Sequence, residues 1–259
     1  MAGGVWRRAE FYCDTAATLR RVVAAVRALD PAPAFAVLGG DLVSSDLLDR
    51  DRVLTSKEYE PSYSLLLEIL SGLPCPAHFL MGNHDDRGAF NRVLRPTAAL
   101  DAPATGSFDH GGYHFVTLDS HEPGRVDGVL GAAQLAWLAR DLAAHRGQPT
   151  VAFVHHHPWP LGIAWLDELA LRDGDELMRV LGQAGDVQWV IAGHVHLDQA
   201  IERGGLTLLT TPSTCVQFSK TSQQKKMLAG PPGFRVVDVA GDALSTRVLH
   251  LHVEAAGEL

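Results

Sequence analysis

The sequence predicts an α/β fold in which a layered β-sandwich is flanked by helices. Short apolar segments typical of strands alternate with longer segments whose apolar residues recur every three or four positions, as in helices. From about residue 199 onward, strand and turn signals dominate. Interleaved strands and helices followed by a β-rich part indicate sheets covered by helices, and we expect residues 1–259 to form a single domain.

The helices are predicted from the spacing of apolar residues. Residues 15–29 carry apolar side chains at helical intervals with arginines on the opposite side, and Asp14 or Thr15 would cap the first turn. The same spacing predicts helices over residues 62–70, 132–144 and 175–181. The polar and charged residues 44–57 predict a surface loop.

The strands are predicted from short apolar runs bounded by turn residues. These runs cover residues 35–38, 77–81, 108–109, 113–119, 151–154, 187–192 and about 244–252. Gly111-Gly112 predicts a hairpin, and Gly204-Gly205 predicts a further turn.

Composition narrows the classes of function. The formal net charge of −8 argues against non-specific binding to a nucleic acid polymer or an anionic membrane, since both carry negative charge. The three cysteines are widely spaced without a CxxC pair, which favours a reducing cytoplasm. No apolar run approaches the roughly 20 residues of a membrane span. We therefore expect a cytoplasmic protein that acts on a small substrate.

Four motifs that could bind metal or phosphate follow predicted strands. They are Gly39-Gly40-Asp41, Gly82-Asn83-His84-Asp85, His155-His156-His157-Pro158 and Gly193-His194-Val195-His196. Carboxylate, amide oxygen and imidazole suit divalent transition ions of intermediate hardness. The carboxyl ends of strands are also where α/β folds place their sites. Together the motifs predict a metal-dependent hydrolase whose substrates are phosphate esters.

Each motif also has a structural alternative. Asp41 could accept hydrogen bonds or cap a helix instead of binding a metal, and Asn83 could cap a helix over residues 86–94. His84 could be a ligand or a general acid. His194 and His196 lie two residues apart, so on an extended backbone they would share one face.

The pattern GGD, GNHD, HHHP and GHVH resembles the calcineurin-like metallophosphoesterases and covers most of the chain. Finer features resemble the bacterial class III cyclic-nucleotide phosphodiesterases and the related glycerophosphodiesterases. These features are Asp14-Thr15 before the first helix, HHHPWPLG over residues 155–162 and TPSTCVQF over residues 211–218.

The resemblance implies a two-metal site. In the family, the aspartate that matches Asp41 bridges both ions. The residues that match Asn83, His155 and His194 are the remaining ligands of one ion. His156 is the alternative to His155, and the residue that matches His196 is a ligand of the other ion. The match of His84 sits by the leaving group as proton donor or charge stabiliser. The divalent ions would be Mn, Fe, Co or Zn.

The resemblance also implies the reaction. Two ions would supply a metal-activated hydroxide for in-line attack on a small phosphodiester, such as cAMP or a glycerophosphodiester. Alternatives are a phosphomonoesterase, and a metal-deficient relative that binds a nucleotide or a protein partner without turnover. A homodimer through the acidic C-terminal part is a further expectation.

One family feature is absent from this sequence. The family opens with a strand that ends in Asp-x-His and supplies two further ligands to the ion served by His196. Here Met1 to Cys13 contains no histidine, and Glu10 is its only carboxylate. Either the sequence starts late or the metal position has been lost. For the chain as given we expect one well-held ion, a weak second ion, reduced activity and open sheet edges.

Histidines outside the motifs are expected to be structural or exposed. They are His78, His110, His114, His121, His145, His250 and His252. Asp119 ends a predicted strand, and we expect it to hold the site residues in place without being a metal ligand itself.

Overall fold

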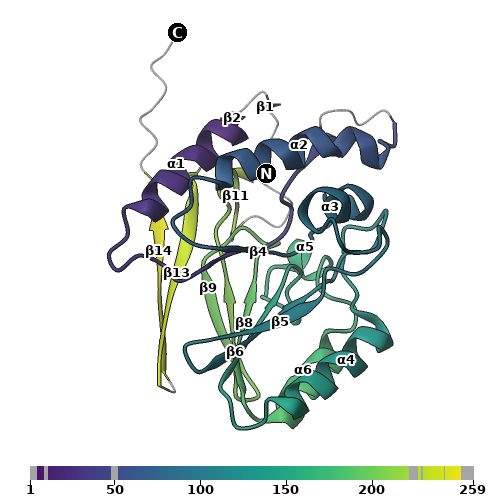
Figure 1. Cartoon of the computed structure of the whole chain (residues 1–259), viewed down its shortest axis with the longest axis vertical. Coiled ribbons are helices and arrows are strands. Elements are labelled where there is room, and N and C mark those ends of the chain that lie inside the picture. Colours follow the sequence, from purple (N-terminus) through teal and green to yellow (C-terminus); the bar gives the residue numbers. More distant parts are fainter. Residues whose placement is uncertain are drawn as a thin grey trace.

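The computed structural model describes residues 5–8, 11–47, 52–221, 227–228, 230–241 and 243–251. It has four layers, with helices on the two outer sides and sheets between them (Figure 1). The α/β fold with sheets flanked by helices is therefore as predicted.

The largest sheet has six strands in the order β5-β6-β7-β8-β10-β9. Its strands are β5 (Gly106–His110), β6 (Tyr113–Leu118), β7 (Thr150–Val154), β8 (Val187–Ala192), β9 (Gln199–Arg203) and β10 (Leu206–Thr210). Strands β6, β7, β8 and β10 are parallel, and the two outer strands are antiparallel to their neighbours. The parallel strands therefore end at the same edge of the sheet, as a site built on strand ends requires.

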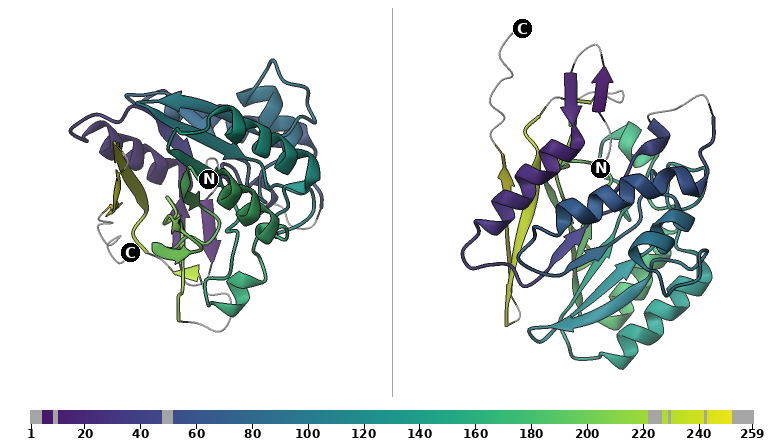
Figure 2. Two further views of the ribbon diagram at one scale, coloured as in Figure 1. Left: turned by 90° about the horizontal axis from the view of Figure 1, so that it is seen from below. Right: turned by 45° about the horizontal axis from the view of Figure 1, so that its top comes forward.

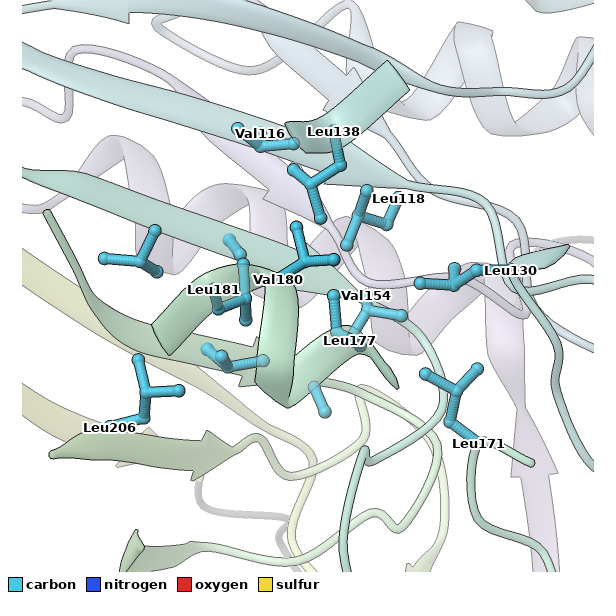
Figure 3. Packing of buried hydrophobic residues seen from close by; sticks show 14 of the residues in the cluster. Val116, Leu118, Leu130, Leu138, Val154, Leu171, Leu177, Val180, Leu181 and Leu206 are labelled. Carbon is cyan, nitrogen blue, oxygen red and sulfur yellow. The ribbon is translucent and has the colours of Figure 1, made fainter. Parts of the chain in front are cut away.

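One face of this sheet is covered by α4 (Gly131–Ala144) and α6 (Gly174–Ala184). Buried side chains from both helices, including Leu138 and Leu177, pack on Val116 and Val154 of the strands (Figure 3). Val190 of β8 belongs to the same cluster. The apolar spacing that predicted these helices corresponds to this buried face.

The other face packs against two smaller sheets. One pairs β3 (Ala36–Leu38) with β4 (Ala77–Phe79) in parallel, and the other pairs β13 (Gly233–Ala240) with β14 (Ala243–His250). Val37 and Val237 of these sheets pack on a buried cluster that includes Phe115 and Phe153. Outside them lie α1 (Thr15–Arg27) and α2 (Ser56–Leu70), so the second layer of sheets is also covered by helices (Figure 1).

Helix starts follow local capping chemistry. Asp14 caps α1, since its Oδ1 atom accepts the amide of Ala17 at 2.9 Å. Helix α2 begins six residues earlier than predicted, because Thr55 and Glu58 form a capping box. The predicted loop over residues 44–57 contains a short 3₁₀ turn at Ser45–Leu47, and its residues 48–51 lie outside the described part.

The remaining elements are short. They are α3 (Arg87–Leu94), α5 (Ala164–Asp167), β11 (Gln217–Phe218) and β12 (Met227–Leu228). The β-rich end of the chain is present, but it does not form a unit of its own. Strands β9 and β10 complete the large sheet, whereas β13 and β14 belong to the second layer.

The residues before α1 form strands that the sequence did not predict. β1 (Val5–Arg8) and β2 (Phe11–Asp14) pair with each other in antiparallel fashion, beyond the N-terminal end of α1 (Figure 2). Among the described strands neither pairs with β3 or β13. We predicted no strand in this segment, and that prediction was wrong. The segment forms strands because its two halves pair with each other in antiparallel fashion.

No helix in the described part of the chain is long and apolar enough to cross a membrane.

A candidate metal centre at the strand ends

The four motifs follow four strands whose carboxyl ends meet. Asp41 follows β3, Asn83 follows β4, His155 follows β7 and His194 follows β8. Because β3 is parallel to β4 and β7 is parallel to β8, each sheet delivers two motif loops to one edge. The sequence prediction that these residues lie at strand ends is therefore met.

Asp41 lies in a tight turn that only small neighbours permit. Its own φ is 51°, and that of Gly40 is 93°. A Cβ atom at Gly82 would fall 2.2 Å from the Asp41 carboxylate, and one at Gly40 would fall 2.4 Å from the His155 ring. The amide of His84 donates to Asp41 Oδ1 at 2.8 Å. The glycines of both motifs thus allow two loops and an imidazole to converge on one buried carboxylate.

His155 is oriented with one ring nitrogen toward the site. Its Nδ1 atom lies 2.7 Å from the carbonyl oxygen of Gly39, so it donates there. Nε2 is then the accepting nitrogen of the ring, and it lies 3.1 Å from His194 Nδ1 and 3.4 Å from an Asp41 oxygen. A carbonyl that fixes the tautomer behind an imidazole is the arrangement found around metal-binding histidines.

Several buried polar atoms at this edge have no hydrogen-bond partner among the described residues. They include Asn83 Oδ1, His194 Nε2 and His196 Nδ1. Buried polar atoms are costly to leave unpaired, and amide oxygen and imidazole nitrogen are metal donors. Asn83 is not the cap of α3, because Asp86 accepts the amide of Ala89 at 2.7 Å. The donor set therefore fits a divalent transition ion.

His196 reaches this region differently from the prediction. The segment is a turn rather than an extended strand, since the amide of His196 donates to the carbonyl of Gly193 and its φ is 51°. The expectation of a shared face on an extended backbone is therefore wrong. The His196 ring stacks on Phe218 with centroids 4.4 Å apart. Burial lowers the pKa of His196, and the nearby Asp41 offsets part of that shift.

The other two histidines of the triple run have separate roles. His156 is fully buried, and its ring nitrogens lie 2.8 Å from Ser120 Oγ and 3.1 Å from the carbonyl oxygen of Val126. With both nitrogens engaged, His156 is a weaker candidate ligand than His155, although its ring lies near His194. His157 is also fully buried, and neither of its nitrogens has a described partner.

Charges at the site reinforce one another. Burial opposes ionisation of Asp41, but His155 and His84 outweigh it and hold the pKa of the carboxyl well below its usual value. Burial, with smaller effects from neighbouring histidines, lowers the pKa of His194 well below its usual value and that of His196 to about 4. His194 and His196 are therefore neutral beside an ionised carboxylate, which is the protonation state in which an imidazole binds metal.

His84 pairs with a residue that the sequence did not single out. Its Nδ1 atom lies 2.7 Å from Asp46 Oδ2. Burial lowers the pKa of His84, but Asp41 and Asp46 together raise it by more than burial lowers it. The net shift of the pKa is therefore upward. Asp46 lies in the segment read as a surface loop, where an aspartate carries no distinguishing signal.

Asp85 connects two of the motif loops. Its carboxylate accepts the amides of Leu42, Val43 and Gly82 and the hydroxyl of Tyr63, at 2.8 to 3.3 Å. Burial and the nearby charge of Asp41 raise its pKa to about 6. The loop that follows β3 and the loop that follows β4 are therefore held together through one carboxylate, and Tyr63 anchors it to α2.

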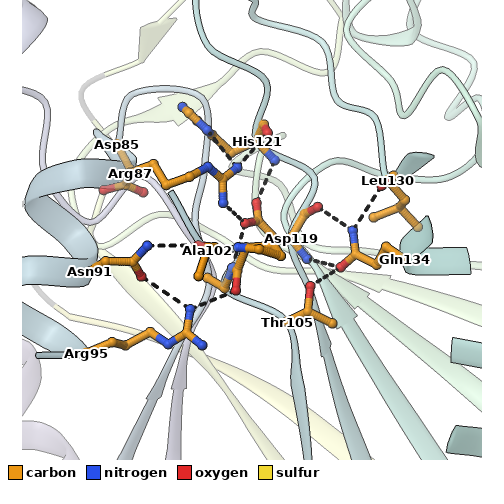
Figure 4. Close-up of polar contacts among 12 residues, drawn as sticks. Asp85, Arg87, Asn91, Arg95, Ala102, Thr105, Asp119, His121, Leu130 and Gln134 are labelled. Carbon is orange, nitrogen blue, oxygen red and sulfur yellow. Dashed lines mark hydrogen bonds and ion pairs between the residues drawn. The ribbon is translucent and has the colours of Figure 1, made fainter. Parts of the chain in front are cut away.

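Asp119 directly follows β6 and lies within a polar cluster (Figure 4). It accepts from Arg87 and from the amides of Ala104 and His121. Arg87 directly follows the GNHDD segment, and it also donates to the carbonyl of His121. Asp119 thus ties the end of β6 to the start of α3, next to the candidate ligands.

A second group of potential ligands lies apart from the motifs, at the far end of β6. The nitrogens of the buried His114 each lie 2.7 Å from a carboxylate oxygen, one of Asp109 and one of Asp141. The His145 ring stacks on His114 with centroids 3.7 Å apart. Because both nitrogens of His114 are engaged by carboxylates, this group joins the β5–β6 hairpin to α4.

Comparison with known families agrees with these motifs. The family model described as calcineurin-like phosphoesterase matches residues 13–198. A protein from Escherichia coli K12 named 3′,5′-cyclic adenosine monophosphate phosphodiesterase CpdA is 32% identical over 205 residues, which is 79% of this chain and 74% of the relative. Its namesake from Pseudomonas aeruginosa is 31% identical over 222 residues, 86% of this chain and 76% of the relative.

Solved structures show the same fold at low sequence identity. A dimetal phosphatase from Danio rerio superposes with a TM-score of 0.63 at 16% identity, covering 90% of this chain and 86% of the other. GAP50, described as the anchor in the inner membrane complex of Plasmodium, gives a TM-score of 0.58 at 14% identity, covering 94% and 80%. Both matches bear on fold alone. With its ordered motifs, family match and relatives above 30% identity, the chain belongs to the calcineurin-like phosphoesterase family.

Proposed function

We propose that this protein is a metal-dependent phosphodiesterase that hydrolyses a small phosphodiester, and that the substrate class is a cyclic nucleotide such as cAMP. The observation that carries the proposal is the convergence of Asp41, His155 and His194. His155 Nε2 lies 3.1 Å from His194 Nδ1 and 3.4 Å from an Asp41 oxygen, and buried atoms that could bind a metal lie beside them without hydrogen-bond partners. The relatives named as cyclic nucleotide phosphodiesterases support the substrate class.

The proposed ligands fall into two sets. Asp41, Asn83, His155 and His194 would hold one divalent ion, and Asp41 with His196 would contribute to a second. When bound, such ions polarise phosphoryl oxygens and lower the pKa of water, which allows displacement at phosphorus near neutral pH. The second set has only two residues, so we propose that it holds its ion more weakly.

His84 is proposed as the residue that acts on the leaving group. Its ring nitrogen Nδ1 is fixed by Asp46, which leaves Nε2 to approach the departing oxygen. Asp46 and Asp41 favour the protonated imidazole, which can donate a proton or stabilise negative charge.

The test is hydrolysis of cAMP by purified protein with and without Mn²⁺. Production of AMP that depends on Mn²⁺ is expected for wild type, and loss of both metal and turnover is expected for Asp41→Ala, Asn83→Ala and His194→Ala. His250→Ala is the matched control, because His250 lies exposed on β14. If Asp41→Ala retained full activity and metal content, the site assignment would be wrong.

A phosphomonoesterase is the second candidate function. Faster release of phosphate from AMP or p-nitrophenyl phosphate than of AMP from cAMP would favour it. We further propose that the protein acts in the cytoplasm. Sedimentation of the purified chain would test the expected homodimer.

A further inference from the structure

Arg235 is a buried arginine that joins the β13–β14 hairpin to the large sheet. Its side chain is 5% exposed. Within the hairpin, Nη1 donates to Thr246 Oγ1 on β14 at 2.9 Å. Nη2 donates to Asp198 Oδ1 at 2.5 Å and to the carbonyl oxygen of Thr210 at 2.7 Å. Asp198 precedes β9 and Thr210 ends β10, so one guanidinium connects two layers of the fold.

The segment held in this way begins directly after the candidate ligand His196. Asp198 lies two residues beyond His196, in the motif loop that follows β8. Thr210 holds the same segment, because its hydroxyl donates to the carbonyl of Leu197 at 2.6 Å and accepts the amide of Gln199 at 3.1 Å. The guanidinium therefore binds both Asp198 and the residue that fixes the two neighbours of Asp198.

His196 needs such support because of its backbone conformation. Its φ is 51°, in the left-handed region that residues other than glycine rarely adopt. A residue stays in that region only when its surroundings fix it there. On the preceding side, the His196 amide donates to the carbonyl of Gly193 at 3.2 Å. On the following side, the contact of Asp198 with Arg235 joins opposite charges, and charge-assisted hydrogen bonds are stronger than neutral ones.

We propose that Arg235 is a positioning residue for His196. Through Asp198 and the end of β10 it fixes the turn that carries His196, and His196 lines one cavity together with Asp41. The inference rests on the proposed role of His196 as a ligand of the more weakly held ion. It extends the site beyond residues 13–198, which the family model matches, to the β13–β14 hairpin.

Loss of this guanidinium should weaken the second ion and leave the first ion in place. The four proposed ligands of the first ion do not include His196. Residues that orient a metal ligand typically change metal affinity by about 10- to 100-fold when they are substituted. A higher Mn²⁺ concentration should therefore compensate for the loss of Arg235.

A tether that only stabilises the fold is the competing explanation for Arg235. Arg247 on β14 supplies the matched control. It donates to Asp238 Oδ2 at 2.8 Å within the same hairpin, and both side chains are half exposed. Arg247→Gln thus removes an arginine of the hairpin without removing a contact to the turn that carries His196.

The first experiment compares Arg235→Gln, Arg235→Lys and Arg247→Gln with the wild-type protein in EDTA. Amide hydrogen exchange is measured by NMR at His196 and along β8. In Arg235→Gln, exchange at His196 should be faster by about tenfold or more, while the β8 amides keep their wild-type rates. Arg247→Gln should change neither. Equal acceleration at His196 and along β8 would show a loss of overall stability and would overturn the inference.

The second experiment titrates the same variants with Mn²⁺ and follows both metal binding and cAMP hydrolysis. Arg235→Gln should raise the Kd of the weaker ion, and the Mn²⁺ concentration for half-maximal hydrolysis, by about 10- to 100-fold. At saturating Mn²⁺, kcat should return to the wild-type value. Arg235→Lys should recover part of the affinity, because an ammonium group can still pair with Asp198. Wild-type Mn²⁺ affinity in Arg235→Gln would overturn the inference.

Asp198→Asn decides the question if Arg235→Gln does not fold. The Asp198 side chain is 52% exposed, and its substitution leaves the guanidinium its bonds to Thr246 and Thr210. Exchange at His196 and the Kd of the weaker ion should rise in this variant too, and an absence of both changes would contradict the inference. If wild type does not hydrolyse cAMP, the proposed function fails, whereas exchange in EDTA and Mn²⁺ binding still decide the role of Arg235.

Discussion

The Nδ1 atom of His84 lies 2.7 Å from Oδ2 of Asp46, across a sequence separation of 38 residues. This pair fixes the ring of His84, which we do not count among the metal ligands. A carboxylate behind an imidazole fixes its tautomer and supports its charge, which suits a group that acts on a leaving oxygen.

The first prediction concerns this pair. His84→Ala should lower kcat for cAMP hydrolysis by about 10²- to 10⁴-fold while metal content stays near that of wild type. Asp46→Asn should cause a smaller loss, because the imidazole remains but its orientation and charge are less well supported. Steady-state kinetics with metal analysis on the same samples tests both. Loss of metal in His84→Ala would instead make His84 a ligand.

The second prediction concerns two arginines of the same helix. Arg87→Ala should lower the free energy of unfolding by about 3 kcal/mol, because the fully buried Asp119 loses its cationic partner. Arg92→Ala should cost less than about 1 kcal/mol, since its pair with Glu60 is substantially exposed. Urea denaturation of both variants is the measurement. Equal costs would show that Asp119 is satisfied by its backbone donors alone.

The third prediction concerns the carboxylate that joins the two motif loops. Tyr63→Phe removes a hydroxyl donor, 2.8 Å from Oδ1 of the buried Asp85, and should destabilise the protein by about 1–3 kcal/mol. Tyr59→Phe, on the same helix, is the control and should cost less. Thermal unfolding in EDTA separates this effect from metal binding. Indistinguishable variants would show that the three backbone amides suffice for Asp85.

The fourth prediction concerns pH and the start of α2. Bonds from Arg52 and Thr55 lower the pKa of Glu58 from 4.5 to about 2. A carboxyl with a lowered folded-state pKa stabilises the protein above pH 4.5, and this contribution is lost as the pH falls toward 2. Wild type should therefore exceed Glu58→Gln in stability at pH 6, and the difference should shrink by pH 3. A difference independent of pH would contradict the assignment.

Much of the candidate site was predictable because its residues occur in short motifs directly after apolar strands. Asp41, Asn83, His155 and His194 could be placed at strand ends without knowledge of contacts. The orientation of His155 and the pairing of His156 with Ser120 could not be placed in this way, since they depend on loops far apart in sequence.

The contributions of Asp46 and Tyr63 were missed for a related reason. Each residue gains its role through one contact with a distant motif, and nothing adjacent in sequence marks it. The β1–β2 pair was missed because Arg7, Arg8 and Glu10 interrupt the apolar residues of this segment and weaken the strand signal. The left-handed backbone at His196 was also missed, because non-glycine residues rarely adopt it.

The most direct test of the central claim is metal content per chain, measured alongside cAMP hydrolysis with and without Mn²⁺. The geometry predicts at least one tightly held ion, lost in His194→Ala and retained in His250→Ala, with turnover that rises when Mn²⁺ is added. A wild-type chain that binds no divalent ion, or that hydrolyses cAMP equally well in EDTA, would contradict the assignment of Asp41, Asn83, His155 and His194 as a metal centre.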